Sequence, residues 1–282
     1  MCSYNWKILS KYQNNVPLSK QILKNRNITD IDKFLNPPPI KYYFEKFSLD
    51  FKKSLAISKK IILSSIKNNT PIIIYGDYDS DGVNATAIIY QTIKNELNYN
   101  NVTFFIPNRF SHGYGLSIKA LDEILKNYPK GKKILFITVD TGITAIEEVD
   151  YLKKLGHQII VTDHHQKLPN IPKCDALLWN DQVVGSMISW LLSKAIGSKN
   201  KNSLGLVAIA TVTDLFPVVG INRSIINSGL KILNLNTPLG IKNLLEVSNK
   251  NGQISTYDLG WVIGPRLNAA GRLQDAKIAV DL

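Results

Sequence analysis

The sequence predicts an α/β protein with a mostly parallel, doubly wound sheet, followed by a mainly helical subdomain. Short apolar runs rich in β-branched residues alternate with longer stretches of helical periodicity. This alternation is typical of parallel strands covered by helices on both faces. The expected strands lie near residues 72–75, 102–106, 133–138 and 158–162.

The flanking regions differ in pattern from this alternating segment. Residues 1–50 carry a basic stretch, a proline run and an aromatic cluster, and we expect a small basic docking segment that is helical in pieces. Residues 51–67 place Phe51, Leu55, Ile62 and Ile66 on one face of a helix. The expected units are therefore residues 1–50, an α/β subdomain over 51–183 and a helical subdomain over 184–282. Turn signals divide the last unit near residues 197–203, 236–238 and 250–252.

Composition limits the class of protein. With 282 residues and 44% hydrophobic content, the chain can bury one large core or two small ones. The two cysteines, Cys2 and Cys174, are too far apart in sequence for a zinc knuckle and indicate no disulfide framework. Neither a signal peptide nor a membrane-spanning run is evident. We therefore expect a cytoplasmic protein that does not enter a membrane.

The formal charge of +12 is concentrated near the N-terminus, where residues 1–70 hold 13 Lys and Arg against 4 Asp and Glu. Such an excess favours a polyanionic partner. Abundant lysine can equally reflect a nucleotide bias of the genome, with the side chains coating the surface.

Unusual polar residues follow each expected strand. In a parallel sheet the carboxyl ends of the strands share one edge, where ligands of open α/β folds bind. Residues spread over about ninety positions should therefore converge on one site. They are Asp77, Asp79 and Asp81 after the first strand, Asn108, Arg109 and His112 after the second, Asp140 after the third, and Asp163, His164 and His165 after the fourth.

Several carboxylates in one crevice repel one another and raise each other's pKa, and a bound dication removes that penalty. Carboxylates with one or two imidazoles suit Mn²⁺ or Mg²⁺. Two such ions about 4 Å apart would activate water and neutralise charge on a phosphoryl group. Each motif also has a plainer interpretation: Asp77, Asp79 and Asp81 as a polar turn or helix cap, Asp140 with Gly142 as a turn, and the histidine pair as a surface turn.

Six ordered blocks resemble the motifs of the RecJ exonucleases, a family of the DHH phosphoesterase superfamily. A lone DHH triplet would recur by chance, whereas six blocks in order over about two hundred residues are specific. The blocks are IIIYGDYDSDGVNATAIIY (72–90), IPNRFSHGYGLS (106–117), TVDTGI (138–143), VTDHH (161–165), AIATVTDLFPVVGINR (208–223) and LGWVIGPRLNAAGR (259–272).

The resemblance implies a role for each matching residue. Asp79, Asp81, Asp140, His164 and Asp214 would be the main metal ligands, with Asp140 bridging two ions and Asp77 assisting. His165 would face the scissile phosphate, and Asp163 would orient the imidazoles. Arg109, Arg266 and Arg272 would clamp phosphate, while His112, Tyr114 and Asn268 would shape the strand path. A salt bridge between subdomains remains an alternative for Arg266 and Arg272.

The implied reaction is in-line attack of a metal-activated water on a phosphodiester of single-stranded DNA, releasing 5′-mononucleotides from the 5′ end. The implied setting is DNA repair and recombination, with a single-strand-binding protein and a helicase as partners. Other interpretations are a DHH phosphoesterase acting on short oligonucleotides or cyclic dinucleotides, and a non-catalytic nucleic-acid-binding protein.

The chain departs from the family pattern in places. Thr141 stands where the family usually has Asn, Trp179 replaces an expected Asn, and residues 183–192 match a glycine-rich segment only loosely. Nothing in the sequence resembles the second domain, DHHA1, or the OB-fold of full-length family members. We therefore expect a shortened catalytic core with weakened substrate affinity.

Overall fold

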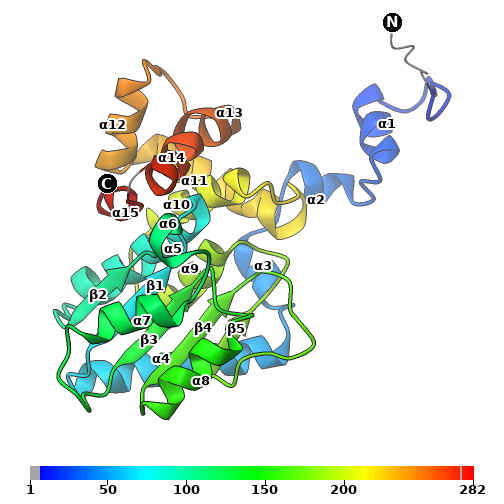
Figure 1. Cartoon of the computed structure of the whole chain (residues 1–282). Helices are drawn as coiled ribbons and strands as arrows, with labels where there is room; N and C mark the ends of the chain where they lie inside the picture. The colour runs from blue at the N-terminus through cyan, green and yellow to red at the C-terminus, as the bar shows by residue number, and fades with distance from the viewer. Residues whose placement is uncertain (1–6, 274) are drawn as a thin grey trace, which may run out of the picture.

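The computed structural model describes residues 7–273 and 275–282. Its centre is a sheet of five parallel strands in the order β2-β1-β3-β4-β5 (Figure 1). The predicted α/β class is confirmed, and each of the four expected strands is present. The strands are β1 (Ile72–Gly76), β2 (Val102–Phe105), β3 (Leu135–Val139), β4 (Gln158–Asp163) and β5 (Ala176–Trp179).

The fifth strand was not predicted. β5 pairs with β4 from Ala176 to Trp179 and forms one edge of the sheet. Its four residues, ALLW, include no β-branched side chain and only one aromatic, so the local pattern carries little strand signal.

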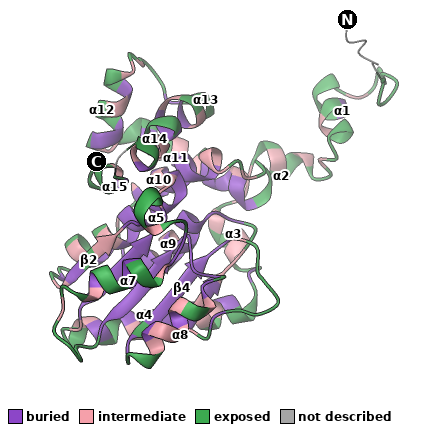
Figure 2. Cartoon of the chain, viewed as in Figure 1, coloured by how far each residue is buried: buried purple, intermediate pink, exposed green. Residues whose placement is uncertain are grey.

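Alternate residues of the strands belong to two separate cores, as the two-residue period of a strand requires. Ile72 and Ile74 of β1 pack with helices α4 (Leu49–Lys67), α5 (Ser80–Gln91) and α9 (Gly185–Ile196). Ile73 and Tyr75 pack on the other face with α7 (Ile118–Leu125) and α8 (Ile146–Lys154). Strands β1, β3 and β4 are accordingly buried on both faces. The outer faces of α4 and α7 are exposed, whereas α5 and α9 are buried along most of their length (Figure 2).

Helix α4 begins two residues before the predicted helix, because Ser48 caps its N-terminus by accepting a hydrogen bond from the backbone N–H of Phe51. Phe51, Leu55 and Ile62 are buried as expected. Ile66 is only half-buried, and serines complete the buried face instead.

The N-terminal segment is helical in short pieces. Helix α1 lies apart from the sheet at the far end of the molecule (Figure 1). The next two helices return to the main body, where Ser224 Oγ of α11 (Gly220–Leu235) donates to the carbonyl of Pro38 at 2.7 Å. The three pieces are α1 (Leu18–Asn25), α2 (Ile31–Leu35) and α3 (Ile40–Phe44). A docking role for residues 1–50 stays a prediction.

Beyond residue 183 the described chain is helical, and the three expected turns fall between helices. Helices α10 and α11 pack closely because Gly229 leaves no side chain between them: a Cβ there would lie 2.4 Å from the Cβ of Ala208. The remaining elements are α6 (Arg109–His112), η1 (Thr92–Glu96), α10 (Ser203–Thr213), α12 (Leu239–Val247), α13 (Thr256–Asp258), η2 (Leu259–Ile263), α14 (Gly264–Leu273) and α15 (Lys277–Asp281).

The strand order places a topological switch between β1 and β3. The chain leaves β1 for β2 on one side and then crosses to β3 on the other. The carboxyl ends of these two strands therefore open a crevice. Among the described residues, none of the helices is both long and apolar enough to cross a membrane. Cys174 is a free cysteine, and Cys2 lies outside the described residues.

Candidate metal centre

The loop between β1 and α5 carries three carboxylates at the switch in strand order. Asp79 caps α5, since its Oδ1 accepts the backbone N–H of Gly82 at 2.9 Å. Asp77 Oδ1 accepts the N–H of Tyr78 at 2.7 Å, whereas its Oδ2 is buried and makes no hydrogen bond within the described part of the chain. The cap interpretation therefore describes Asp79 but leaves one oxygen of Asp77 unexplained.

Asp81 joins the loop to the start of α9. Its two carboxylate oxygens accept the backbone N–H groups of Gly185 and Ser186, at 2.6 and 2.8 Å. Free N–H groups and the helix dipole make a helix N-terminus favourable for a negative charge. Sequence patterns could not indicate this contact, because backbone donors carry no residue signature beyond the small Gly185.

Asp140, at the end of β3, is the most enclosed carboxylate of the site. Its side chain is 0% exposed, and neither oxygen makes a hydrogen bond to any described residue. Its backbone φ of 62° lies in the left-handed region, which is costly for a non-glycine residue and is concentrated at functional sites. Gly185 lets α9 approach it: a Cβ there would lie 2.5 Å from Asp140 Oδ1.

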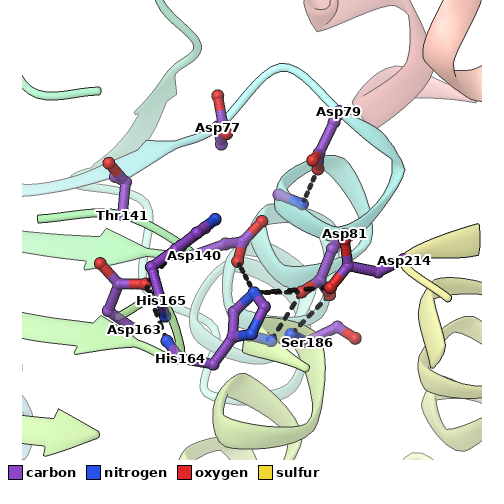
Figure 3. Close-up of polar contacts among 12 residues, drawn as sticks. Asp77, Asp79, Asp81, Asp140, Thr141, Asp163, His164, His165, Ser186 and Asp214 are labelled. Carbon is purple, nitrogen blue, oxygen red and sulfur yellow. Dashed lines mark hydrogen bonds and ion pairs between the residues drawn. The ribbon is translucent and has the colours of Figure 1, made fainter. Parts of the chain in front are cut away.

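The imidazole of His164 lies among the carboxylates, and Figure 3 shows it pointing toward Asp140, Asp81 and Asp214. Its Nε2 is 3.0 Å from Asp140 Oδ1, 3.5 Å from Asp81 Oδ2 and 3.7 Å from Asp214 Oδ2. Loss of hydration on burial lowers the pKa of His164 and favours the neutral ring that binds metals.

The donor atoms fall into overlapping sets. In each set one donor atom per residue lies within 4.8 Å of the others, a spacing that one cation can bridge. Asp140 and His164 each belong to two sets, so the sets share ligands. They are Asp77, Asp79 and Asp140; Asp81, His164 and Asp214; and Asp140, His164 and His165.

The electrostatics also fit a cation. Burial, with help from neighbouring carboxylates, raises the pKa of Asp77 and of Asp214 to about 7. The same causes raise the pKa of Asp79, and that of Asp140 well above its usual value. Ionising all of these groups together is costly without a compensating positive charge. The residues therefore fit one or more divalent ions with oxygen and imidazole ligands.

Asp163 organises the loop that carries the histidines. It accepts the backbone N–H groups of Ile143, His164 and His165, at 2.8, 2.7 and 3.0 Å, and contacts His165 Nδ1 at 2.8 Å. Burial raises the pKa of Asp163, but these hydrogen bonds outweigh it and the net pKa is lowered. The hydrogen bond to Asp163 raises the pKa of His165 to about 9. Tyr114 Oη lies 3.1 Å from the other ring nitrogen, His165 Nε2.

The three arginines predicted to bind phosphate lie in two different surroundings: Arg109 and Arg272 act on Tyr78, and Arg266 does not. The guanidinium carbon of Arg109 lies 6.0 Å from the ring centre of Tyr78, a residue of the loop between β1 and α5, which is called the metal loop from here on. Both Arg109 and Arg272 act electrostatically on the hydroxyl of Tyr78. Arg266 is exposed and donates to the carbonyl of Val262 one helical turn earlier. His112 has both ring nitrogens in local contacts, with Asn108 and Glu123.

Asn268 makes a contact that the sequence did not predict. Its side-chain carbonyl accepts the backbone N–H of Ser80 at 2.7 Å, between Asp79 and Asp81. Helix α14 approaches this loop closely, because a Cβ on Gly271 would lie 2.4 Å from the carbonyl oxygen of Tyr78. In this structure Asn268 therefore holds the metal loop.

Comparisons with known proteins identify the family of the chain. A profile of the DHH family, N-terminal domain, matches residues 71–211, half of the chain. The chain is 33% identical over 290 residues to the single-stranded-DNA-specific exonuclease RecJ of Bacillus subtilis (strain 168), a match that covers 98% of the chain and 36% of that relative. The chain thus spans about a third of the length of this curated relative.

Two solved structures resemble the chain. A crystal structure of exonuclease RecJ bound to manganese superposes with a TM-score of 0.71 and 28% identity, over 80% of this chain and 60% of the other. RecJ of Thermus thermophilus in complex with Mn²⁺ superposes with a TM-score of 0.68 and 26% identity, over 81% and 34%. The profile match over half of the chain and the identity to RecJ of Bacillus subtilis show that this chain belongs to the DHH family.

Proposed function

We propose that the chain is the catalytic core of a metal-dependent exonuclease that degrades single-stranded DNA from the 5′ end and releases 5′-mononucleotides. The observation that carries the proposal is the fully buried Asp140 carboxylate, whose oxygens accept no hydrogen bond among the described residues and whose Oδ1 lies 3.0 Å from the candidate ligand atom His164 Nε2. A protein that only binds nucleic acid has no need for such a costly group. Similarity to RecJ exonucleases supports the substrate class.

Two ions, Mn²⁺ or Mg²⁺, fit the donor sets. Asp77, Asp79 and Asp140 would hold one ion, and Asp81, His164 and Asp214 the other. Asp140 and His164 also belong together to the third set, which links these two. Bound ions of this kind supply an activated water and neutralise charge developing on the phosphoryl group. The manganese in the RecJ structures that resemble this chain supports the assignment.

The chain's own side chains orient the phosphodiester. The hydrogen bond to Asp163 raises the pKa of His165 to about 9, and the side chain of His165 is 39% exposed. With Asp163 fixing Nδ1, the Nε2 proton can be donated to a phosphate oxygen in place of its contact with Tyr114. Arg109 and Arg272, near Tyr78, would grip the next phosphate. Attack of water on the phosphorus would leave a new 5′-phosphate on the remaining strand, the bond from phosphorus to the 3′ oxygen would break, and that oxygen would take up a proton as the 5′-mononucleotide departs.

The cellular setting is part of the same proposal. Single-stranded DNA is the primary partner, and a single-strand-binding protein and a helicase would supply and maintain the strand. DNA repair and recombination, in the cytoplasm, is the setting that the similarity to RecJ favours.

The test is release of mononucleotides from 5′-labelled single-stranded DNA with Mn²⁺. Asp140→Asn is the matched control, because it preserves shape while removing the charge that two ions would share. We expect the unaltered chain to release labelled mononucleotide from single strands, to leave duplex DNA intact, and to lose at least about a thousandfold in rate on Asp140→Asn. Equal release by the variant would refute the proposal, as would release confined to the 3′ end.

A further inference from the structure

A cavity of about 980 Å³ opens at the same sheet edge as the metal centre, beyond the end of β5. Its walls come from four parts of the chain: residues 43–54, Lys167, residues 177–182 and residues 216–222. This volume is at the upper end of the range for ligand sites. None of its lining residues belongs to the metal-binding sets.

The cavity adjoins the metal centre through two aromatic residues. The ring of Phe216 lies 5.3 Å from the ring of His164, and the indole Nε1 of Trp179 donates to the carbonyl of His165 at 2.7 Å. Neighbouring strands of a sheet are about 4.8 Å apart, so Trp179 at the end of β5 lies one strand away from Asp163, which directly precedes the two histidines. A DNA strand bound at His164 and His165 would therefore place its next nucleotide at this cavity.

The lining chemistry suits a nucleotide. The ammonium of Lys167 lies over the ring of Trp179, 3.7 Å from its centre, so a base that stacks on this face has to take the place of the lysine. Asn222 is 5% exposed, and its side-chain N–H donates to the Gln182 carbonyl, but its Oδ1 makes no hydrogen bond to any described residue. Base stacking on aromatic rings, with lysine near phosphate, is how proteins bind single strands without reading sequence.

The charges of the lining also bear on the occupant. Lys46 and Lys167 line the cavity together with Asp50 and Asp181, so the lining as a whole carries no net charge. An interior without net charge suits an uncharged base, while the phosphates remain outside near the lysines. A purely apolar ligand or lipid would leave these polar groups unpaired.

We propose that this cavity binds a nucleobase of the strand next to the scissile phosphate, with Trp179 as the stacking surface and Lys167 contacting the adjacent phosphate. The inference rests on the proposed function, since it places the strand by the metal centre. Trp179 is then a substrate-positioning residue that sets affinity for strands longer than one nucleotide.

The probes are four 5′-phosphorylated tetradeoxynucleotides, each with the fluorescent base 2-aminopurine at a different one of the four positions. In each of them the first linkage is a non-hydrolysable phosphonate. When the chain binds these probes in the presence of Mn²⁺, we expect the 2-aminopurine fluorescence to be strongly quenched at one position only. Trp179→Leu should weaken binding by roughly 5- to 150-fold, the range for loss of one base–aromatic stack, while Trp179→Phe retains most of the affinity. Lys167→Gln should reduce the slope of log affinity against log salt by about 0.7.

Trp261→Leu is the matched control, because Trp261 is 71% exposed on η2 and does not line the cavity. Wild-type affinity of Trp179→Leu for the probes would overturn the proposal. Equal losses of affinity in Trp179→Leu and Trp179→Phe would also overturn it, because the effect would then come from the lost indole N–H. The proposal would likewise be overturned if the chain forms a dimer and Trp179→Leu abolishes that dimer. Cleavage of an ordinary oligonucleotide, measured in parallel, separates the two ideas: cavity binding without cleavage contradicts only the proposed function.

Discussion

The side-chain carbonyl oxygen of Asn268 lies 2.7 Å from the backbone nitrogen of Ser80, a contact that joins residues 188 positions apart. Ser80 stands between two candidate ligands, Asp79 and Asp81, so α14 of the helical subdomain holds the loop that would bind metal. Residues that orient metal ligands typically change metal affinity when altered, although they never touch the ion.

Asn268→Leu should therefore weaken Mn²⁺ binding by about 10- to 100-fold, since it removes the acceptor at similar volume. Asn268→Asp keeps an acceptor oxygen and should retain more of the affinity. Calorimetric titration of Mn²⁺ measures both without any substrate. If both variants bind Mn²⁺ as the unaltered chain does, Asn268 does not position the loop.

Gly185→Ala should abolish metal binding and lower the free energy of unfolding. The new Cβ would lie 2.5 Å from Asp140 Oδ1, which forces either the carboxylate or the start of α9 to move. The control is Ser186→Ala, which keeps the backbone N–H that Asp81 accepts and removes a hydroxyl with no partner in the described structure. Titration should show normal Mn²⁺ affinity for the serine variant, and equal losses in both variants would contradict this explanation.

The stabilisation by Mn²⁺ should grow as the pH rises from 6 to 8. Burial raises the pKa of Asp77 and Asp214 to about 7, so protons compete with the ion below that pH. Without metal, deprotonation through this range costs stability, because the unfolded carboxyl groups ionise near pH 4. An ion at one hundred times its dissociation constant adds about 2.7 kcal/mol. Melting curves with and without Mn²⁺ test this, and a pH-independent shift would argue against these ligands.

His157 should make the protein sensitive to mild acid independently of the metal centre. Burial lowers its pKa, its Nδ1 is buried without a hydrogen bond to a described residue, and its ring packs on Phe136. Because the folded pKa lies below the unfolded value of about 6.5, its contribution to stability is present above that pH and is lost as the pH falls. Between pH 7 and 5 the free energy of unfolding, measured with denaturant, should fall less steeply for His157→Asn than for the unaltered chain. Parallel plots of this free energy against pH would exclude the role of His157.

Much of the fold and of the site could be predicted from local pattern. The β-branched runs located β1 to β4, and the rule that parallel strands share one carboxyl edge predicted that Asp77, Asp140 and His164 meet. β5 was missed because Ala176–Trp179 lacks β-branched residues. Contacts that use the backbone could not be read either: Asp81 with the start of α9, and Asn268 with Ser80, depend on how helices pack rather than on local sequence.

The most direct test of the account is the number of Mn²⁺ ions that one chain binds, determined by titration with electron paramagnetic resonance. The account predicts two ions, with the spectrum of a coupled pair, because Asp140 and His164 also lie together in a third donor set that links the other two. Asp140→Asn should bind no more than one ion and lose the coupling. A single uncoupled ion in the unaltered chain, or a coupled pair that persists in Asp140→Asn, would contradict the two-ion centre.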